Sequence, residues 1–254
     1  MNEWNLYETN YATAKETPYE VAVLPVGACE PHNLHLPYGT DAISVQRVGE
    51  EACRRAAQQG AQVCLLPTIP YGINENTLAM PMTMSIRPSV LFSFIGEIVR
   101  SVEAHGVRKM VLVNGHGGNE FKPLLRELCR ERQVHLFLVD WWQADKEAHK
   151  SLFERAGEHG DEMETSLLLH IAPHLVDLSL ADDGAVYPSR LSAVNEGAAW
   201  LARPWHLLTK NSGYGDPALA TAEKGEQFLN ACVARIAQFL VELSESPLDE
   251  TFPY

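Results

Sequence analysis

A short segment near the amino terminus concentrates side chains that commonly bind metal ions. Within twelve residues it offers two carboxylates and two imidazoles, from Glu30, His32, His35 and Asp41, together with two prolines that restrict the backbone. Carboxylate oxygen and imidazole nitrogen are donors that divalent transition metals combine in proteins. The alternative is a polar loop whose histidines hydrogen-bond locally. We favour a metal site because these donors directly follow residues 21–26, an apolar run typical of a buried strand.

A second polar segment, residues 114–119, places His116 among three glycines. Its spacing matches neither the G-x-G-x-x-G pattern of dinucleotide-binding loops nor the G-x-x-x-x-G-K-[ST] pattern of P-loops. Glycine lets the backbone turn sharply and approach a metal or substrate closely. We therefore interpret the segment as a loop that directs His116 into a site; a tight turn with an exposed histidine is the alternative.

A third histidine, His159, directly precedes a predicted helix whose first residues are acidic. Acidic side chains in the first turn commonly serve the helix dipole, and this interpretation stays open for Asp161 and Glu162. His159 could instead face the site as a general acid or base.

The elements that must position these side chains alternate between strands and helices. The predicted strands are 21–26, 63–66, 109–113 and 135–139, and the predicted helices that follow them are 42–59, 88–105 and 120–132. This alternation predicts right-handed crossovers and a parallel sheet, that is, an α/β fold. Ligand sites in such sheets lie outside the carboxyl ends of the strands. The polar segments all follow strands, so we expect them to meet at one edge.

The carboxyl-terminal half is less regular. Predicted helices cover residues 162–171 and 218–242, a turn-rich connection covers 181–188, and Gly225 interrupts the last helix, where it indicates close packing. No repeat, low-complexity segment or linker is apparent, so we predict one domain over residues 1–254.

Composition narrows the function classes. The hydrophobic content of 46% and charged content of 21% are ordinary for a globular enzyme. A net charge of −13 argues against nucleic acid or an anionic membrane as a partner. The first four residues lack the features of a signal peptide, and no apolar run approaches a membrane span. Five scattered cysteines without a Cys-x-x-Cys pair favour reduced thiols, and we expect a cytoplasmic protein.

Four motifs, in order along the chain, resemble those of the creatininase (creatinine amidohydrolase) family. Residues 30–41 (EPHNLHLPYGTD) resemble its E-x-H-x-x-H-L-P-x-x-T-D signature, and residues 114–119 its N-G-H-G-G-N. Residues 159–166 (HGDEMETS) resemble H-A-G-E-x-E-T-S, and residues 212–217 with Lys224-Gly225 resemble S-G-x-x-G-D-P…K-G. The resemblance implies a three-layer α/β/α sandwich around a mostly parallel sheet, and often a ring-shaped homo-oligomer, commonly a hexamer.

The resemblance also implies one or two divalent ions, zinc, manganese or iron. The reaction that it implies is hydrolysis of a non-peptide or small amide C–N bond, so we expect an amidohydrolase that acts on C–N bonds other than ordinary peptide bonds. The positions that match metal ligands, with Asp41 as the bridging carboxylate, are Glu30, His32, Asp41 and His116. His159 matches a proton-transfer histidine, and Glu164 matches a site carboxylate that could join the metal shell. The expected reaction uses a metal-activated water as nucleophile, with His159 protonating the leaving nitrogen of a small-molecule amide.

Several positions depart from the family pattern. Creatinine hydrolases proper carry a glutamate where this chain has Gly118, which questions both the second metal and creatinine as the substrate; Glu164 could compensate. Asn33-Leu34 replaces Gly-Pro, and residues 80–83 replace an aromatic-Pro-Gly-Thr segment. Both changes could reshape the substrate pocket.

The substrate pocket is expected at the same edge. The residues predicted to contact substrate are His35, Tyr71, Gly117, Gly118, Asn119, Trp141 and Trp142. For either tryptophan, packing in the core is the alternative. Formamide, lactam and short-peptide bonds remain open as substrates beside creatinine. A metal-bearing binding or assembly protein without turnover is the rival from another class, and a serine hydrolase is disfavoured because no G-x-S-x-G elbow occurs.

Overall fold

The computed structural model describes residues 2–131 and 133–254 and contains a four-stranded parallel sheet. The strands are β1 (Val21–Val26), β2 (Val63–Leu65), β3 (Lys109–Asn114) and β4 (His135–Asp140), in the order β2-β1-β3-β4. The predicted parallel sheet is thus confirmed. Val26 pairs with Asn114, which in turn pairs with Asp140, so the carboxyl ends of the last three strands in this order are level. The loops that follow these strands therefore start side by side.

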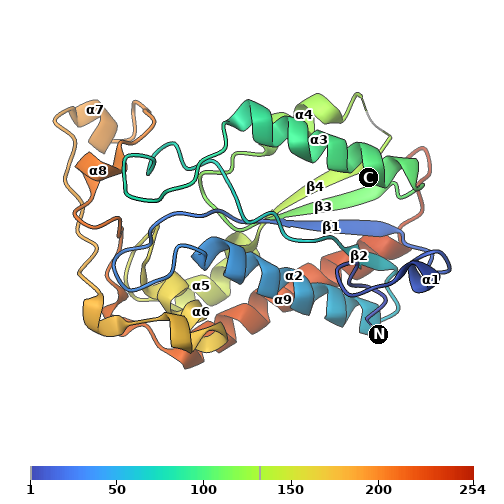
Figure 1. The fold of residues 1–254 in the computed structure, drawn as a ribbon, viewed down its shortest axis with the longest axis horizontal. Coiled ribbons are helices and arrows are strands. Elements are labelled where there is room, and N and C mark those ends of the chain that lie inside the picture. The colour runs from blue at the N-terminus through green and yellow to red at the C-terminus, as the bar shows by residue number, and fades with distance from the viewer. Residues whose placement is uncertain (1, 132) are drawn as a thin grey trace.

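Helices cover both faces of the sheet (Figure 1). On one face lie α2 (Thr40–Gln58) and α9 (Ala222–Glu245), and on the other lie α3 (Pro88–Ala104) and α4 (Lys122–Leu128). Strand side chains alternate between the two cores: Val21, Val23, Val111 and Val113 join the first, whereas Ala22, Leu24, Met110 and Leu112 join the second. Side chains of a strand alternate between faces, so two apolar cores require strands without a polar face. The three-layer prediction is confirmed.

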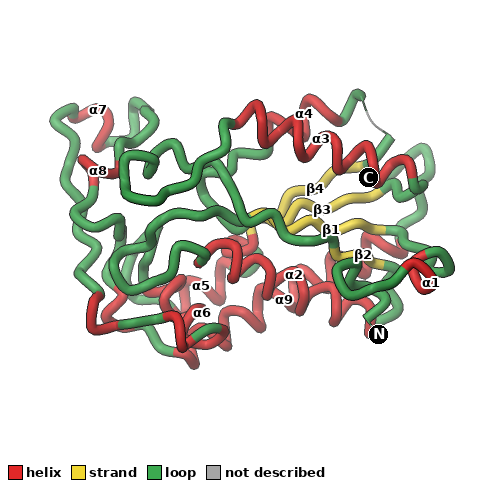
Figure 2. Tube along the Cα trace, in the orientation of Figure 1, coloured by secondary structure: helices red, strands yellow, loops and turns green. Residues whose placement is uncertain are grey.

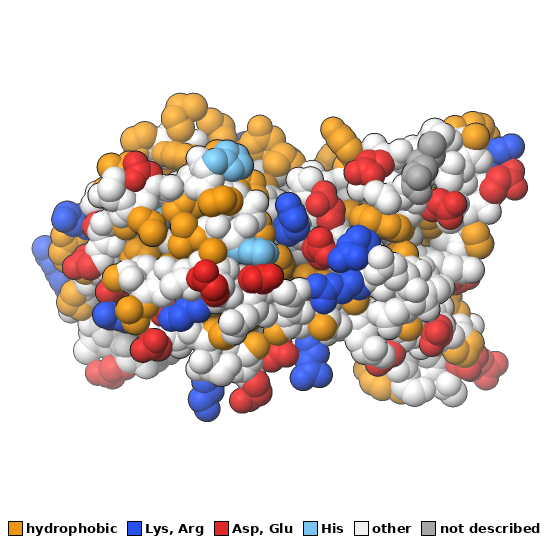
Figure 3. Space-filling model, turned by 90° about the horizontal axis from the view of Figure 1, so that it is seen from below, with side chains coloured by type: hydrophobic (Ala, Val, Ile, Leu, Met, Phe, Trp, Pro, Cys, Tyr) orange, Lys and Arg blue, Asp and Glu red, His pale blue; other side chains and the backbone are white. Residues whose placement is uncertain are grey.

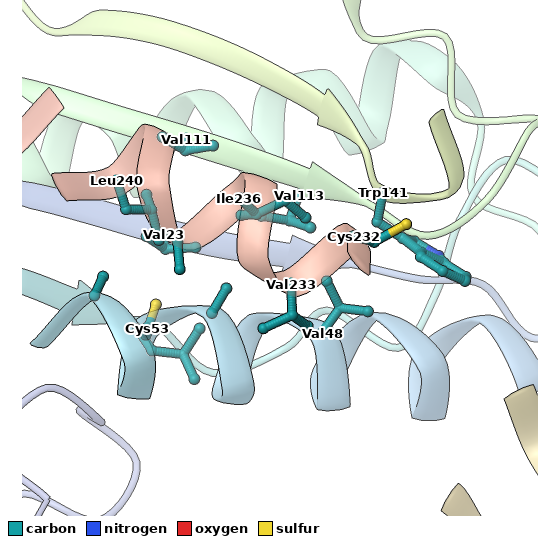
Figure 4. Packing of buried hydrophobic residues seen from close by; sticks show 14 of the residues in the cluster. Val23, Val48, Cys53, Val111, Val113, Trp141, Cys232, Val233, Ile236 and Leu240 are labelled. Carbon is teal, nitrogen blue, oxygen red and sulfur yellow. The ribbon is translucent and has the colours of Figure 1, made fainter. Parts of the chain in front are cut away.

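The core between the sheet and α2 and α9 is closely packed (Figure 4). Valines of β1 and β3 meet Val48 and Cys53 of α2 and Val233 and Ile236 of α9. Trp141, at the end of β4, belongs to this core and is only 2% exposed. The sheet and these helices form a rigid frame for the loops at the carboxyl edge.

The remaining elements lie mostly around that edge. They are the helices α5 (Lys146–Leu152), α6 (Glu162–Ile171), α7 (Ser192–Asn195) and α8 (Trp205–Leu208), the amino-terminal α1 (Tyr11–Ala14), and 3-10 turns at Trp141–Gln143, Pro173–Leu175, Leu178–Leu180 and Pro217–Leu219. Figure 2 shows that α7 and α8 belong to a loop-rich end of the molecule, beyond the carboxyl ends of the strands and opposite the two termini. Within the described residues, no helix is both apolar and long enough to cross a membrane.

Three sequence predictions needed correction. The helix predicted over 120–132 is shorter, since α4 ends at Leu128, and residue 132 lies outside the described residues. The last helix begins at Ala222, where the side chain of Thr221 caps it, after a 3-10 turn occupies the predicted first residues. Gly225 does not interrupt this helix. A Cβ there would overlap the Ser166 carbonyl oxygen, which confirms the predicted close packing against α6.

Candidate metal centre

Five ionisable side chains from four segments meet at the carboxyl edge of the sheet. The loop after β1 brings Glu30 and His32, the first turn of α2 brings Asp41, the loop after β3 brings His116, and the first turn of α6 brings Glu164. The first four are buried, and the Glu164 side chain is 15% exposed. Burial of so many charged groups is costly unless they are paired or bind a metal.

A first group of possible ligands consists of Glu30, Asp41 and His116. The Nδ1 atom of His116 lies 3.1 Å from Glu30 Oε1 and 3.1 Å from Asp41 Oδ2. Thr77 Oγ1 donates a hydrogen bond to the other Glu30 oxygen at 2.6 Å. This bond orients the carboxylate, as the partners of metal ligands commonly do.

A second group consists of His32, Asp41 and Glu164. The Nε2 atom of His32 lies 3.1 Å from Asp41 Oδ1 and 3.9 Å from Glu164 Oε1. Glu164 Oε2 accepts the Gly160 backbone N–H at 2.6 Å. Asp41 belongs to both groups and turns a different oxygen toward each of them.

The histidines are oriented as ligands are. His32 Nδ1 lies 3.0 Å from the Glu30 carbonyl oxygen, and His116 Nε2 lies 3.1 Å from the Ile73 carbonyl oxygen. A carbonyl oxygen can only accept, so each of these nitrogens carries a proton. The opposite nitrogen of each ring faces the carboxylates. Such N–H to carbonyl bonds fix the tautomer of metal-binding histidines, and the residues present therefore fit a metal ion.

The pKa shifts within the cluster also fit a bound cation. Burial opposes ionisation of Glu30, but His116 and His159 outweigh it and lower its pKa to about 2. Burial also disfavours a charged His32, yet Asp41 and Glu164 raise its pKa to about 10. The protein alone thus balances its carboxylates with protons on imidazoles. A divalent cation supplies the same positive charge, and its binding displaces such protons.

The pKa values of His159 and Glu164 are shifted in the opposite sense to those of the other histidine and glutamate. Burial and the neighbouring His32 lower the pKa of His159 to about 4, and burial raises the pKa of Glu164 to about 8. The Nε2 atom of His159 lies 2.7 Å from the Pro31 carbonyl oxygen, so it carries the proton. Its Nδ1 atom is then free of a proton and lies 3.8 Å from Glu30 Oε1. A neutral imidazole in this orientation can accept a proton at the site.

Gly118 lies against His116, and a side chain there has no room. A Cβ at this position would overlap His116 Nε2 and the Ile73 carbonyl oxygen, the two atoms of the bond that orients His116. A glutamate at position 118 would therefore require the loop to rearrange. Glu164 supplies the third carboxylate of the cluster from a different element.

A cavity of about 680 Å³ opens onto these side chains. Of the residues predicted to contact substrate, Gly117, Gly118, Trp141 and Trp142 line it. His35, Tyr71 and Asn119 are not among its lining residues. The structure therefore brings only part of the predicted contact set to the cavity.

The three other predicted contacts have identifiable surroundings. His35 is buried, with Nε2 2.8 Å from Thr165 Oγ1. Tyr71 is 47% exposed. Asn119 joins neighbouring loops, since its side chain binds the Gly27 carbonyl oxygen and the Ile73 N–H.

Several residues around the site were missed from the sequence. Thr77, which holds Glu30, comes from a loop with no distinctive local pattern. Ser212, which donates to the Pro31 carbonyl oxygen, lies in the motif of residues 212–217 but was not predicted as a site residue. Arg203 and Trp205 line the cavity from the irregular segment around α8. Their side chains reach the site only through tertiary packing, so no spacing in the sequence could indicate them. Enrichment of aromatic residues near α8 was the one sequence feature that drew attention to this segment.

Comparisons with known proteins agree with this geometry. The creatininase family profile, described as creatinine amidohydrolase, matches residues 5–240. The mycofactocin precursor peptide peptidase of Mycobacterium ulcerans is 30% identical over 248 residues, covering 92% of each chain. The creatinine amidohydrolase of Pseudomonas putida is 29% identical over 262 residues, covering 94% of each chain. These relatives are hydrolases.

Solved structures extend the comparison. A candidate creatinine amidohydrolase from Bacteroides fragilis superposes with a TM-score of 0.91 at 35% identity, covering 98% of this chain and 100% of that one. Creatininase structures that also match, at 25% identity, include a manganese form with a TM-score of 0.75 and a Zn–Zn form of a mutant with a TM-score of 0.76. The chain belongs to the creatininase family.

Proposed function

We propose that this protein is a metal-dependent hydrolase of amide C–N bonds. The observation that carries the proposal is Asp41, whose two oxygens face two separate groups of imidazole and carboxylate ligands. Glu30 and His116 would complete the first ion's ligands, and His32 and Glu164 the second's. Metal-bound creatininase structures of similar fold support this assignment.

The protein's own side chains account for proton transfer. Divalent ions at this site supply Lewis-acid polarisation and lower the pKa of water toward neutrality. His159 keeps one proton on Nε2 through the Pro31 carbonyl oxygen, so Nδ1 is the atom that accepts a proton from the nucleophile and returns it to the leaving nitrogen. Burial of these side chains strengthens their electrostatic interactions.

We propose a linear amide, such as a short peptide, as a better substrate than creatinine. The cavity of about 680 Å³ lies within the ordinary range for ligand pockets, so it has room for a ligand larger than creatinine. Gly118 occupies the position at which creatinine hydrolases carry a glutamate. A relative with 30% identity is named a peptide peptidase. A small cyclic amide or a formamide remains the second candidate, supported by the creatinine amidohydrolase relative.

A substrate panel tests the proposal. Zinc- or manganese-loaded protein is assayed against creatinine, a formamide, a lactam and a set of unmodified dipeptides to hexapeptides, with His116→Ala as the paired control. We expect kcat/KM to be highest for a peptide or linear amide and to fall about 10³-fold or more in His116→Ala. Preference for creatinine would overturn the substrate assignment. Absence of turnover on every class would overturn the enzyme assignment and favour a binding protein.

A further inference from the structure

His159 is held between two other rings. Its imidazole stacks on that of His32, with ring centroids 4.0 Å apart and planes inclined by 29°. The indole of Trp205 makes an edge contact with the same imidazole, with ring centroids 4.8 Å apart and planes inclined by 75°. His159 is 6% exposed and Trp205 is also 6% exposed. The two neighbours leave the imidazole little space in which to turn.

The backbone of His159 is also fixed. It forms an antiparallel bridge with Tyr214, whose N–H donates to the His159 carbonyl oxygen at 2.7 Å. The histidine ring itself has a broad torsional minimum about its last side-chain bond, as all such sp³–sp² bonds do. A single hydrogen bond, from Nε2 to the Pro31 carbonyl oxygen, opposes rotation about that bond. Packing by His32 on one side and Trp205 on the other supplies the remaining restraint.

Trp205 is itself held by two contacts, and one of the contacting residues also binds the segment before His159. Its backbone N–H donates to the Asn76 carbonyl oxygen at 3.0 Å, which joins α8 to the loop that carries Thr77. The guanidinium of Arg203 lies over its indole ring, 5.4 Å from the centroid. Arg203 Nη1 also binds Glu158 Oε2 at 2.7 Å, and Glu158 directly precedes His159. The tryptophan is therefore coupled to the same backbone segment as the histidine that it contacts.

We propose that Trp205 is a positioning residue for His159, which keeps its imidazole in the orientation that leaves Nδ1 facing the carboxylates. The inference rests on the proposed proton-transfer role of His159. Trp205 lines the cavity and its indole contacts His159, and we assign its effect to the orientation of the histidine rather than to a step of the reaction. A misplacement of a catalytic group by about 1 Å costs about 10²-fold in rate. A tryptophan that merely fills the core would affect stability and leave the imidazole unchanged.

Three variants test this proposal: Trp205→Ala, Trp205→Phe and Leu207→Ala. Leu207 belongs to the same helix, is 66% exposed and does not line the cavity, so it controls for disturbance of α8. In Trp205→Ala we expect kcat to fall by about 10- to 100-fold with KM changed by less than about threefold. Trp205→Phe keeps a ring against His159 and should recover most of kcat, and Leu207→Ala should match the wild type.

A second readout does not depend on activity. Nitrogen-15 NMR spectra of zinc-loaded protein labelled at histidine report which ring nitrogen carries the proton, and His159→Gln assigns the signal. We expect His159 to be a single Nε2–H tautomer in the wild type and in Trp205→Phe, and a mixture in Trp205→Ala, at unchanged zinc content.

The outcomes separate the two proposals. An unchanged tautomer and unchanged kcat in Trp205→Ala would overturn the positioning role, and so would a loss of activity that merely follows loss of zinc. If Trp205→Ala does not fold, a wild-type tautomer and kcat in a Trp205→Leu variant, which lacks the ring, would overturn it equally. If the wild type shows no hydrolysis but the tautomer still depends on Trp205, the proposed function fails while the positioning of His159 stands.

Discussion

At the scale of single residues, Gly118 shows how one small position shapes the metal centre. Glycine permits the ring N–H of His116 to reach the Ile73 carbonyl oxygen, because a Cβ at position 118 would overlap both atoms. The neighbouring Gly117 faces open space, and a Cβ placed there would meet nothing within 4 Å. The two glycines are adjacent in sequence, yet only one is required by the orientation of a proposed ligand.

We therefore expect Gly118→Ala to weaken metal binding. Displacement of the carbonyl that orients a metal-binding histidine typically costs about 10- to 100-fold in affinity. Titration of the metal-free protein with zinc, followed by calorimetry, measures the change. Gly117→Ala is the matched control and should bind zinc as the wild type does. Equal affinities in the two variants would contradict the role assigned to Gly118.

The residues of the proposed site were predictable to different degrees. Residue type and position after a predicted strand indicated Glu30, His32, His35 and Asp41 as possible ligands. The resemblance to the creatininase family then gave the set Glu30, His32, Asp41 and His116. Thr77 and Trp205 could not be predicted, because a threonine in a long loop and a tryptophan near a four-residue helix have no signal of their own. Their roles arise from contacts between segments far apart in the sequence.

At the scale of elements, a buried ion pair ties α6, α9 and the preceding loop together. Lys224 of α9 binds Glu162 Oε1 of α6, and Glu162 Oε2 accepts the backbone N–H groups of Glu154 and Arg155. The Glu162 side chain is fully buried and that of Lys224 is 22% exposed. The pair thus closes the loop that carries His159 against the helix that carries Glu164.

This pair should contribute stability that depends on pH. Burial opposes ionisation of Glu162, but the hydrogen bonds from Lys224 and the two backbone N–H groups hold its pKa below the ordinary value of 4.5. Because the pKa of Glu162 is lower in the folded state, the ion pair contributes its full stabilisation above pH 4.5. This stabilisation is lost as the pH falls through the folded-state pKa.

Lys224→Met removes the cation and leaves a buried carboxylate. We expect its free energy of unfolding at pH 7 to be about 3 kcal/mol lower than that of the wild type, since breaking a buried pair costs that much. The difference should shrink as pH is lowered below 4.5. Urea unfolding at several pH values measures it, with the exposed Lys210→Met as control. A difference that is independent of pH would contradict the assignment.

The sequence predicted elements well where a regular pattern exists. Four strands and the helices α2, α3 and α6 appear within a few residues of their predicted bounds, because strand and helix periodicities are strong in buried segments. The region from 172 to 221 could not be predicted, since it consists of short turns whose conformation depends on the site and helices that it packs against. Gly225 lies between these cases: its close packing was predictable, but the continuity of its helix depends on α6.

At the scale of the whole molecule, large apolar side chains remain exposed around α7 and α8. Those with at least 40% exposure between residues 187 and 207 are Tyr187, Leu191, Trp200, Leu201 and Leu207. In the face shown in Figure 3, hydrophobic side chains gather toward the upper left, and charges of both signs are spread over the rest of the face. Exposed apolar surface of this kind commonly marks an interface.

We expect this surface to be buried in a homo-oligomer. Light scattering coupled to size exclusion should give a mass that is a multiple of 28.2 kDa. A Leu191→Glu and Leu207→Glu double variant should shift the protein toward the monomer, because two charges placed in an apolar contact are unfavourable. A wild-type monomer at micromolar concentration would contradict the expectation.

We propose that the carboxylate–imidazole cluster holds two divalent ions that the hydrolysis requires. Metal analysis of the protein before and after chelation, combined with an assay on its best amide substrate, tests this claim most directly. We expect activity to be lost on chelation and to recover when about two equivalents of zinc or manganese per chain are restored. Glu164→Gln should retain only about one equivalent. Full activity in protein shown to be free of metal would contradict it.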